Sequence, residues 1–440
     1  MDEFRGLTGY ARAIRQFSRN ARLYLIHIWG MDLIHGTWDV LFNLYLLAIG
    51  FTIEFIGLRL LIQGIAGALA SIPAGFISDR IGRKWSFILG DGGGAAMALL
   101  NITTIHPTVL LVTPVFNALA GALHSVSEPA FMAENSRRAE RVHLFSVGGG
   151  FSTLAVMAGA LIVGAFPGEF ASALHKVALY RWTTYGGIAL WFLSLIPAWL
   201  LRELQPEEKG AEPEAEVLEP ARPTVLKLGG LPIGTVAHPG TVFKLVLTSA
   251  LISFGAGFVV PLFNVFFHEG LHAHEHQIGT TVGVGNAFLA VGALLVPFVS
   301  ERLGKIQTVV VTRLLSIPFI FVIAFSNDLA ANLVPAFTLA GIGYVARIML
   351  MNMASPVESA FSMEILDPTE RGTTVGLQQA AGRLLSSVGS YAGAVSMNGG
   401  DFRTPFLFMA GAYFLSTVLF WVFFRRAAPA VALAPVRGGS

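Results

Sequence analysis

Long apolar stretches recur along the whole chain, and they restrict its fold more than any other feature. A helix needs roughly 20 residues to cross a hydrocarbon core about 30 Å thick. Polar or Gly/Pro breaks divide the sequence into twelve segments of about that length or longer. They lie near residues 24–50, 54–78, 85–104, 107–134, 143–166, 180–201, 241–267, 277–300, 307–325, 329–360, 373–396 and 404–425. The predicted fold class is therefore an all-α integral membrane protein with twelve transmembrane helices.

Composition agrees with a chain whose solvent is the bilayer. Of its 440 residues, 54% are hydrophobic and 13% are charged. Its 48 glycines and 21 prolines lie mostly within apolar runs, where small residues let helices approach and proline kinks are tolerated. The absence of cysteine excludes disulfides, iron–sulfur clusters and a thiolate nucleophile. We expect no cofactor and no nucleic-acid partner.

Basic residues fall on every second loop, and this pattern predicts the orientation of the chain. These loops carry Arg80, Arg83 and Lys84; Arg137, Arg138 and Arg141; Arg202, Lys209, Arg222 and Lys227; Arg302 and Lys305; Arg371; and Arg425 and Arg426. Cytoplasmic loops of membrane proteins have this excess of positive charge. We therefore predict a multi-pass protein of the inner (plasma) membrane with both termini in the cytoplasm.

The chain divides into five parts. Residues 1–22 place apolar side chains near one helical face and arginines elsewhere, which predicts an amphipathic helix at the membrane interface. Two six-helix bundles are expected over residues 23–202 and 239–426. The hydrophilic stretch 203–238, rich in glutamate and proline, is interpreted as a cytoplasmic linker, and 427–440 as a cytoplasmic tail.

The two bundles repeat each other's sequence signals. The run Gly75–Lys84 ends in an acid, an arginine, a glycine and basic residues, and Ser300–Lys305 keeps that order. The run Ala130–Arg141 contains Ala-Phe-x-x-Glu and then Glu-Arg, and Ala360–Arg371 repeats this pattern at identical spacing. Parallel repeats of this kind are typical of transporters that build one central site from two halves.

The run Gly75–Lys84 resembles the signature of the major facilitator superfamily, which lies in the loop between helices 2 and 3. The twelve-helix layout, the linker and the second, degenerate copy extend the resemblance over nearly the whole chain. It implies the fold of that family, with two pseudo-symmetric six-helix bundles, and a conformational latch that pairs the halves in one state and releases them in another. The latch residues are Gly75, Asp79, Arg80, Gly82, Arg83, Lys84, Glu134, Arg141, Glu301, Arg302, Glu364 and Arg371. The alternative is that these charges only set topology.

Ionisable and polar residues inside the predicted helices are candidates for a substrate or proton cavity, because a charge in lipid normally faces a partner or water. They are Asp32, His35, Asp39, Glu128, Arg347, Glu358, Gln378 and Arg383. Glu358 and Arg347 share a helical face, and the resemblance implies that helices 1, 4, 7 and 10 line the cavity. The alternative for each is a static polar contact, and Glu128 is equally consistent with a gating ion pair.

A histidine-rich tract lies between the predicted helices 7 and 8. His268, His272, His274 and His276 include a formal His-Glu-x-x-His pattern, which in zinc proteases lies on one helix. The tract is expected in an extracytoplasmic loop without a catalytic domain, so the chain is predicted not to be an enzyme. Binding of a divalent metal by this tract and a merely solvated loop remain the two alternatives.

Together these patterns predict a secondary transporter that moves a small or amphipathic organic solute by alternating access. Coupling to protons is expected through Asp32, Asp39 and Glu358, and export is favoured because carboxylates and aromatic residues suit cationic or amphipathic molecules. The alternatives are uptake of an organic anion, nutrient or metal ion, and a membrane receptor or scaffold that transports nothing. The expected partners are the solute, protons and membrane lipids, with the chain as a monomer.

Overall fold

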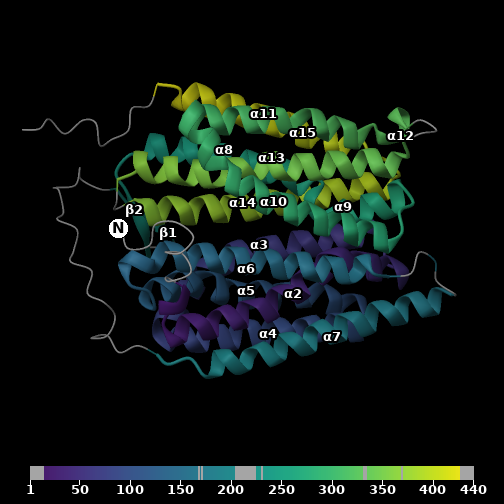
Figure 1. Ribbon diagram of the computed structural model, residues 1–440, viewed down its shortest axis with the longest axis horizontal. Coiled ribbons are helices and arrows are strands. Elements are labelled where there is room, and N and C mark those ends of the chain that lie inside the picture. Colours follow the sequence, from purple (N-terminus) through teal and green to yellow (C-terminus); the bar gives the residue numbers. More distant parts are fainter. Residues whose placement is uncertain are drawn as a thin grey trace, which may run out of the picture. The chain divides into compact units, whose positions relative to one another are not determined.

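The computed structural model describes residues 14–166, 169, 172–203, 224–228, 231–330, 334–367 and 370–426. Twelve long helices cover the twelve predicted segments within this part of the chain (Figure 1). They are α2 (Arg19–Ala48), α3 (Ile53–Ile81), α4 (Arg83–Thr103), α5 (Pro107–Glu134), α6 (Arg138–Gly164), α7 (Ala173–Trp199), α8 (Pro239–Gly257), α10 (Glu275–Leu303), α11 (Lys305–Ala324), α13 (Ala336–Ile365), α14 (Arg371–Asn398) and α15 (Thr404–Phe424). The predicted helical architecture is confirmed.

Eight stretches in the described chain are long and apolar enough to cross a membrane by composition alone. The four other long helices, α2, α4, α7 and α14, are the more polar ones, and each carries ionisable side chains among its apolar residues. Such a helix spans a bilayer only when neighbouring helices or water face its polar side chains. Many of the polar and ionisable side chains described below lie on these four helices.

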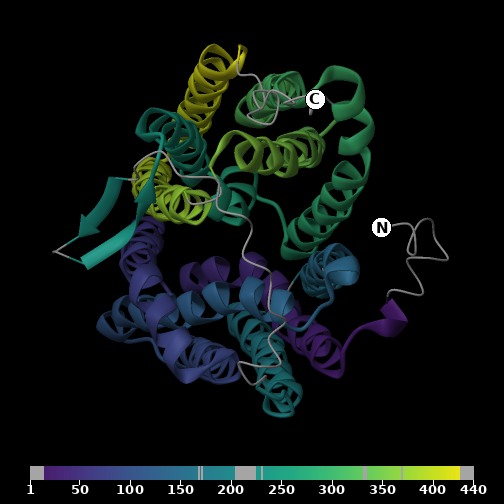
Figure 2. The ribbon, with the colours of Figure 1, turned by 90° about the vertical axis from the view of Figure 1, so that its left-hand side faces the viewer.

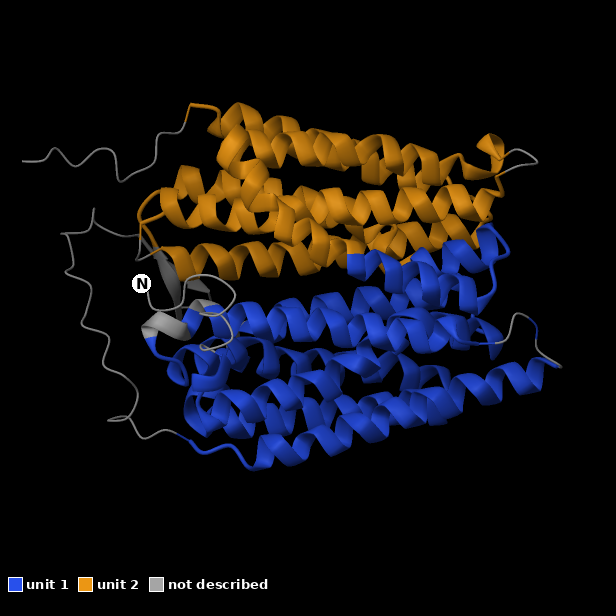
Figure 3. Cartoon of the chain, viewed as in Figure 1, with its two compact units in different colours: residues 1–215, 263–287 blue, residues 216–262, 288–440 orange. Residues whose placement is uncertain are grey.

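Contacts divide the chain into two compact units, which Figure 3 shows in different colours: residues 1–215 with 263–287, and residues 216–262 with 288–440. In the first unit α2 packs on α6 and α7, and α4 packs on α5 and α7. In the second unit α8 packs on α14 and α15, and α11 packs on α13 and α15. The helices of each unit are seen nearly end-on in Figure 2. The sequence repeat therefore appears as the same set of helix pairs in each half.

Glycine allows the closest of these pairs to form. At Gly159 on α6, an added Cβ would lie 2.0 Å from the backbone oxygen of Leu33 on α2. At Gly389 on α14, it would lie 2.5 Å from the backbone oxygen of Phe254 on α8. Transmembrane helices associate through small residues that bring their backbones together. The equivalent pairs α2/α6 and α8/α14 use this device at equivalent positions.

The two acid–base turns also share one backbone conformation. Gly82, between α3 and α4, has φ 87° and ψ 161°, and Gly304, between α10 and α11, has φ 80° and ψ 160°. L-residues with a side chain rarely adopt this region, whereas glycine enters it without steric cost. The glycine that the two sequence motifs share is therefore the residue that lets each turn form.

Two predicted helices are interrupted. The segment 241–267 becomes α8 followed by a 3-10 turn at Val260–Leu262, α9 (Phe263–Val265) and a π-helical turn at Phe266–Gly270. Asn264 lies in this break and its side-chain amide donates to the backbone oxygens of Asp39 (3.0 Å) and Val40 (2.9 Å) on α2. The segment 329–360 starts as α12 (Ser326–Leu329), and α13 begins only after Pro335. Hydropathy does not detect such breaks, because the residues remain apolar.

Residues outside the bundles are described in part. Within the predicted linker 203–238, β1 (Thr224–Leu228) and β2 (Leu231–Val236) form an antiparallel pair with a register shift after Leu226. Residues 204–223, 229–230 and 427–440 lie outside the described part of the chain. So do residues 1–13 of the predicted interfacial helix, whose last residues, 19–22, begin α2. The predicted domain boundaries stay predictions.

Candidate functional site

The predicted latch residues of the first half meet at the turn between α3 and α4. Arg83 Nη2 lies 2.8 Å from Asp79 Oδ1, and Arg83 Nη1 donates to Ser78 Oγ at 2.7 Å. Arg83 Nε also lies 3.7 Å from Glu134 Oε1 at the end of α5. One guanidinium thus ties the end of α3 and the start of α4 to the end of α5.

The second half repeats this contact with a lysine. Lys305, which follows the turn glycine as Arg83 does, forms an ion pair with Glu364 at the end of α13. Arg141 and Arg371, the last members of the repeated run, both donate to backbone oxygens, of Ala133 (3.2 Å) and Leu366 (3.3 Å). Equivalent positions of the sequence repeat therefore make equivalent contacts within each half.

The other predicted latch residues do not join these ion pairs. Arg80, Glu301 and Arg302 have exposed side chains, and Gly75 lies in the last turns of α3. The Lys84 backbone amide donates to Glu203 Oε1 at 2.7 Å. Exchange of latch partners during a transport cycle stays a proposal.

Replacing Glu134 or Glu364 by glutamine should lower the thermal stability of the purified protein modestly. Both pairs are partly exposed, and such pairs contribute about 1 kcal/mol or less. Apparent Tm in detergent measures the effect, and the exposed Glu301→Gln is the matched control. An equal Tm change in the control would contradict a specific role for the two pairs.

The acidic residues predicted on α2 lie in different environments. Asp32 is buried, and its Oδ1 lies 3.2 Å from Nδ1 of His35. Asp39 has an exposed side chain, although its backbone oxygen accepts a bond from Asn264. On α14, the side-chain amide of Gln378 donates to the Leu245 oxygen on α8 at 3.4 Å, and Arg383 is half-buried. None of these positions by itself identifies a substrate.

Arg347 and Glu358 share a face of α13, but each pairs with a different helix. Glu358 forms an ion pair with Arg313 on α11, a buried residue that the sequence analysis did not single out. Arg347 donates to the Tyr413 hydroxyl on α15 at 2.7 Å. Neighbouring helices therefore supply the direct partners of both residues, and their place in a common cavity stays a prediction.

The Arg313–Glu358 pair leaves polar atoms unsatisfied. The Arg313 side chain is 3% exposed and the Glu358 side chain 14% exposed. Within the described chain, Arg313 Nε, Arg313 Nη1 and Glu358 Oε1 are buried and have no hydrogen-bond partner. Buried polar atoms are nearly always paired in stable proteins. An under-satisfied ion pair in a spanning helix is therefore a candidate for a functional switch.

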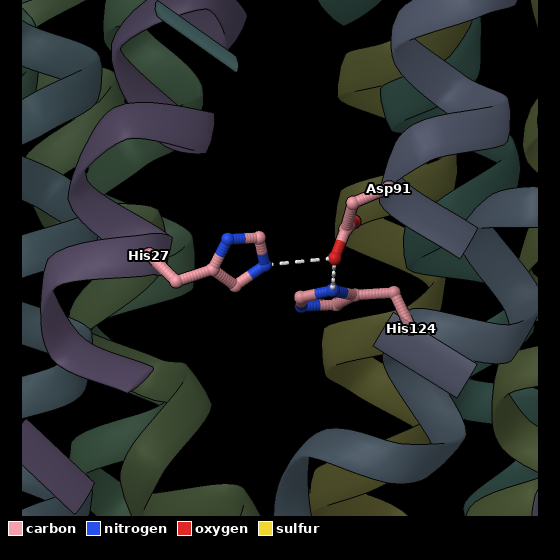
Figure 4. Close-up of side chains that lie close together, drawn as sticks. All are labelled: His27, Asp91 and His124. Atoms are coloured by element: carbon pink, nitrogen blue, oxygen red, sulfur yellow. Dashed lines mark hydrogen bonds and ion pairs between the residues drawn. The ribbon is translucent and has the colours of Figure 1, made fainter. Parts of the chain in front are cut away.

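A second buried cluster lies inside the first unit, where α2, α4, α5 and α7 meet. Asp91 Oδ2 on α4 lies 2.9 Å from His27 Nε2 on α2 and 2.9 Å from His124 Nδ1 on α5 (Figure 4). His27 is 0% exposed and Asp91 3% exposed. On their other sides, His27 Nδ1 lies 2.8 Å from the backbone oxygen of Ser194 on α7, and His124 Nε2 lies 3.8 Å from Glu128 Oε2.

The sequence analysis named Glu128 but missed His27 and Asp91. The signal was present, since both are ionisable residues within predicted spanning segments. Asp91 lies in the run Gly90-Asp-Gly-Gly-Gly94, and its small neighbours let the adjacent helices approach the carboxylate. His27, Asp91 and His124 each offer one possible metal-ligand atom, and these atoms lie within 4.8 Å of one another. Imidazole nitrogens and a carboxylate oxygen are also ligand types that suit a metal ion.

The histidine tract lacks the geometry of a zinc protease. His268 lies in the π-helical turn, whereas His272 lies beyond it with φ 52°, so the two do not share one helical face. His268 Nδ1 donates to the Ala273 backbone oxygen at 3.1 Å, and its Nε2 lies 3.5 Å from Lys176 Nζ. Beside it Glu275 is buried and binds Lys176 Nζ (2.6 Å) and the Tyr180 hydroxyl (2.5 Å).

A polar pocket opens at this tract, within the first unit. Its volume is about 450 Å³. It is lined by Glu169, Lys176, His268, Glu269, His272, Ala273, His274 and Glu275. His274 and His276 have stacked rings 5.8 Å apart. Because His268 is already engaged on both ring nitrogens, this pocket is a weaker metal candidate than its histidine count indicates.

Comparison with known proteins gives one family and one fold. The Major Facilitator Superfamily family model matches residues 33–355. No curated protein sequence matches the chain significantly.

Three solved structures illustrate the likeness of fold. The nucleoside transporter NupG has 14% identity and a TM-score of 0.68 over 93% of this chain and 100% of its own. A bacterial homologue of the iron transporter ferroportin, in an inward-facing state, has 15% identity and a TM-score of 0.65 over 92% of this chain and 98% of its own. A D-xylose-proton symporter has 15% identity and a TM-score of 0.66 over 94% of this chain and 98% of its own.

These likenesses agree with the helical architecture and the repeated halves described above, and they support a membrane transporter rather than an enzyme. The family match covers well over half of the chain and includes the acid–base turn at Gly82. The chain belongs to the major facilitator superfamily.

Proposed function

We propose that this protein is a proton-coupled secondary transporter that exports a small or amphipathic organic solute by alternating access. The observation that carries the coupling is the Arg313–Glu358 ion pair. It joins two spanning helices, α11 and α13, and leaves buried polar atoms on both partners without hydrogen bonds. Unpaired buried polar atoms cost free energy, so an arrangement that pairs them would compete with this one.

Exchange at Glu358 supplies the coupling. The carboxylate can hold Arg313 or a proton, and protonation removes the charge that attracts the guanidinium. A state of the transporter that separates α11 from Glu358 would then bind a proton more tightly than the state with the pair formed. Protons bias a conformational equilibrium only through such a difference in affinity between states.

The proposed substrate class follows from the remaining groups. Acidic side chains lie on α2 at Asp32 and Asp39, and aromatic residues make up 11% of the chain. Carboxylates attract cations, and aromatic faces bind both cations and apolar groups. Export of such a solute forms part of the proposal.

The proposed arrangement in the cell completes this picture. It comprises a monomer in the inner (plasma) membrane, both termini in the cytoplasm, and latch pairs at Arg83 and Lys305 that open and close during the cycle. The alternation of basic loops supports the orientation. Charge-assisted pairs at the ends of helices support the latch, because they can change partners when the helix ends move.

Proton flux in proteoliposomes tests the coupling. A pH-sensitive dye is trapped inside, and cationic, anionic and neutral solutes are added to wild type, Glu358→Gln and the exposed control Glu54→Gln. We expect one solute class to move protons with wild type and Glu54→Gln, and Glu358→Gln to lose this flux while still exchanging labelled solute. Solute transport without proton movement in wild type would contradict the proposal.

A second candidate is uptake of an organic anion, nutrient or metal ion. The pocket lined by His268, His272 and His274 favours it, because imidazole and carboxylate groups bind divalent cations. Flux restricted to anions, or to a divalent metal, would support this candidate. A protein that moves no solute of any class would instead be a receptor or scaffold.

A further inference from the structure

We infer that His27, Asp91 and His124 form a buried proton-binding site, and that its proton is taken up and released during transport. Binding of a proton at this cluster concerns the first unit alone. Uptake and release of that proton during transport rests on the proposed function, and it assigns a coupling site on α2, α4 and α5, separate from Glu358.

The contact to Ser194 fixes one proton of His27. A backbone carbonyl can only accept, so His27 Nδ1, 2.8 Å from the Ser194 oxygen, must carry a hydrogen. In neutral imidazole the other nitrogen then has no hydrogen. His27 Nε2 lies 2.9 Å from Asp91 Oδ2. An ionised carboxylate also only accepts, so this contact requires one additional proton, on His27 or on Asp91.

His124 completes the count. Its Nδ1 lies 2.9 Å from the same oxygen, Asp91 Oδ2, and donates to it. Its Nε2 lies 3.4 Å from the Tyr24 hydroxyl, and either group can be the donor there. With one proton shared by His27 and Asp91 and with a neutral His124, the cluster has no net charge, and each contact has a donor and an acceptor.

Losing the shared proton is costly while the cluster stays closed. Two lone pairs would then face each other across 2.9 Å, and a net negative charge would remain among groups at most 9% exposed. An isolated buried charge is strongly disfavoured relative to one in water. The proton therefore leaves when α2, α4, α5 and α7 separate enough to admit water, which ties its release to a conformational change.

The charged groups that act on the cluster from neighbouring positions are acidic. Besides Asp91, the charges that act on His124 are those of Glu128 on α5 and Asp32 on α2, and both are acidic. The α7 helix contributes the Ser194 carbonyl, and its titratable residues, His175 to Tyr185, all lie at least nine positions earlier in the chain. Nearby acids stabilise an added positive charge.

A metal ion is the competing occupant, since two histidines and a carboxylate also suit divalent metals. However, each donor atom already makes a contact of 2.9 Å, the usual length of a hydrogen bond. The outer nitrogen of each histidine likewise has a partner. The arrangement is complete with a proton alone.

Nitrogen NMR of ¹⁵N-histidine-labelled full-length protein in lipid nanodiscs tests occupancy. We expect the His27 Nε2 signal to keep one position, that of a nitrogen bonded to or hydrogen-bonded by the shared proton, between about pH 6 and about pH 9, a range that includes the ordinary titration of histidine. His27→Gln assigns the signal, and His175→Gln, at an exposed position of α7, is the control. A His27 Nε2 signal at the position of a free, unprotonated nitrogen within this range, or saturable Zn²⁺ binding that Asp91→Asn removes, would overturn the proton site.

Flux measurements test coupling. In Asp91→Asn we expect solute-driven proton movement to fall about tenfold or more while labelled-solute exchange persists, and His27→Gln should behave alike if Asp91→Asn folds poorly. Unchanged proton movement in these variants, with flux lost in Glu358→Gln, would overturn the coupling role and leave the proposed function standing. Absence of solute-driven proton flux in wild type would overturn both, while the NMR result would still decide occupancy.

Discussion

Replacing Gly159 by valine should prevent the chain from accumulating as a folded membrane protein. An added Cβ there would lie 2.0 Å from the Leu33 oxygen and 2.9 Å from the Thr37 nitrogen, both backbone atoms of α2. No rotamer change relieves a clash with backbone, so α2 and α6 must separate along their length. Overpacking commonly costs 1–3 kcal/mol, and here we expect a loss above about 3 kcal/mol.

The yield of monodisperse protein after size-exclusion chromatography measures this effect. Gly149→Val on the same helix is the control, because no atom lies within 4 Å of a Cβ added there. The repeat predicts the same contrast in the second half, between Gly389→Val and Gly376→Val on α14. Equal yields of Gly159→Val and Gly149→Val would show that the α2/α6 contact is not needed for folding.

Replacing Arg313 by methionine should destabilise the protein by about 3–5 kcal/mol, because it leaves the Glu358 carboxylate buried without its counter-ion. The double variant Arg313→Met/Glu358→Met should recover most of this loss, since a buried ion pair often contributes little more than apolar residues of similar size. The cation also lies 5.7 Å from the Phe420 ring centre, a contact that methionine replaces in part.

Denaturation of the purified variants in detergent measures this difference, read as a double-mutant cycle. The exposed pair Asp328 and Arg403, with Nη2 to Oδ1 2.5 Å apart, is the control, and Arg403→Met should cost about 1 kcal/mol or less. If Arg313→Met and the double variant lose the same stability, the pair is not coupled and Arg313 stabilises through packing alone.

The helices and the repeat could be predicted because their signals are local. Twelve apolar segments are visible in the sequence, and the two acid–base runs align by spacing alone. The aligned basic residues, Arg83 and Lys305, occupy equivalent turns and contact equivalent acids, Glu134 and Glu364, although these contacts within each half were not predicted. Because the halves repeat, a motif recognised in one half locates its counterpart in the other.

The tertiary partners of buried charges could not be predicted in the same way. Helical periodicity places Arg347 and Glu358 on one face, but the distance along a helix does not say which neighbouring helix supplies a partner. Arg313 and Tyr413 come from helices that are remote in sequence. The cluster at Asp91 likewise needs three helices to meet, so its members appear singly in the sequence.

The carboxylate of Glu370 also holds the start of α8 in place. Glu370 is 0% exposed and accepts hydrogen bonds from the backbone amides of Ala237 (2.7 Å) and His238 (2.8 Å). It therefore lies at the amino-terminal ends of both α8 and α14, where helix dipoles favour negative charge. We therefore expect an insertion made ahead of residue 224, such as a reporter domain, to leave the Glu370 contacts at the start of α8 unchanged.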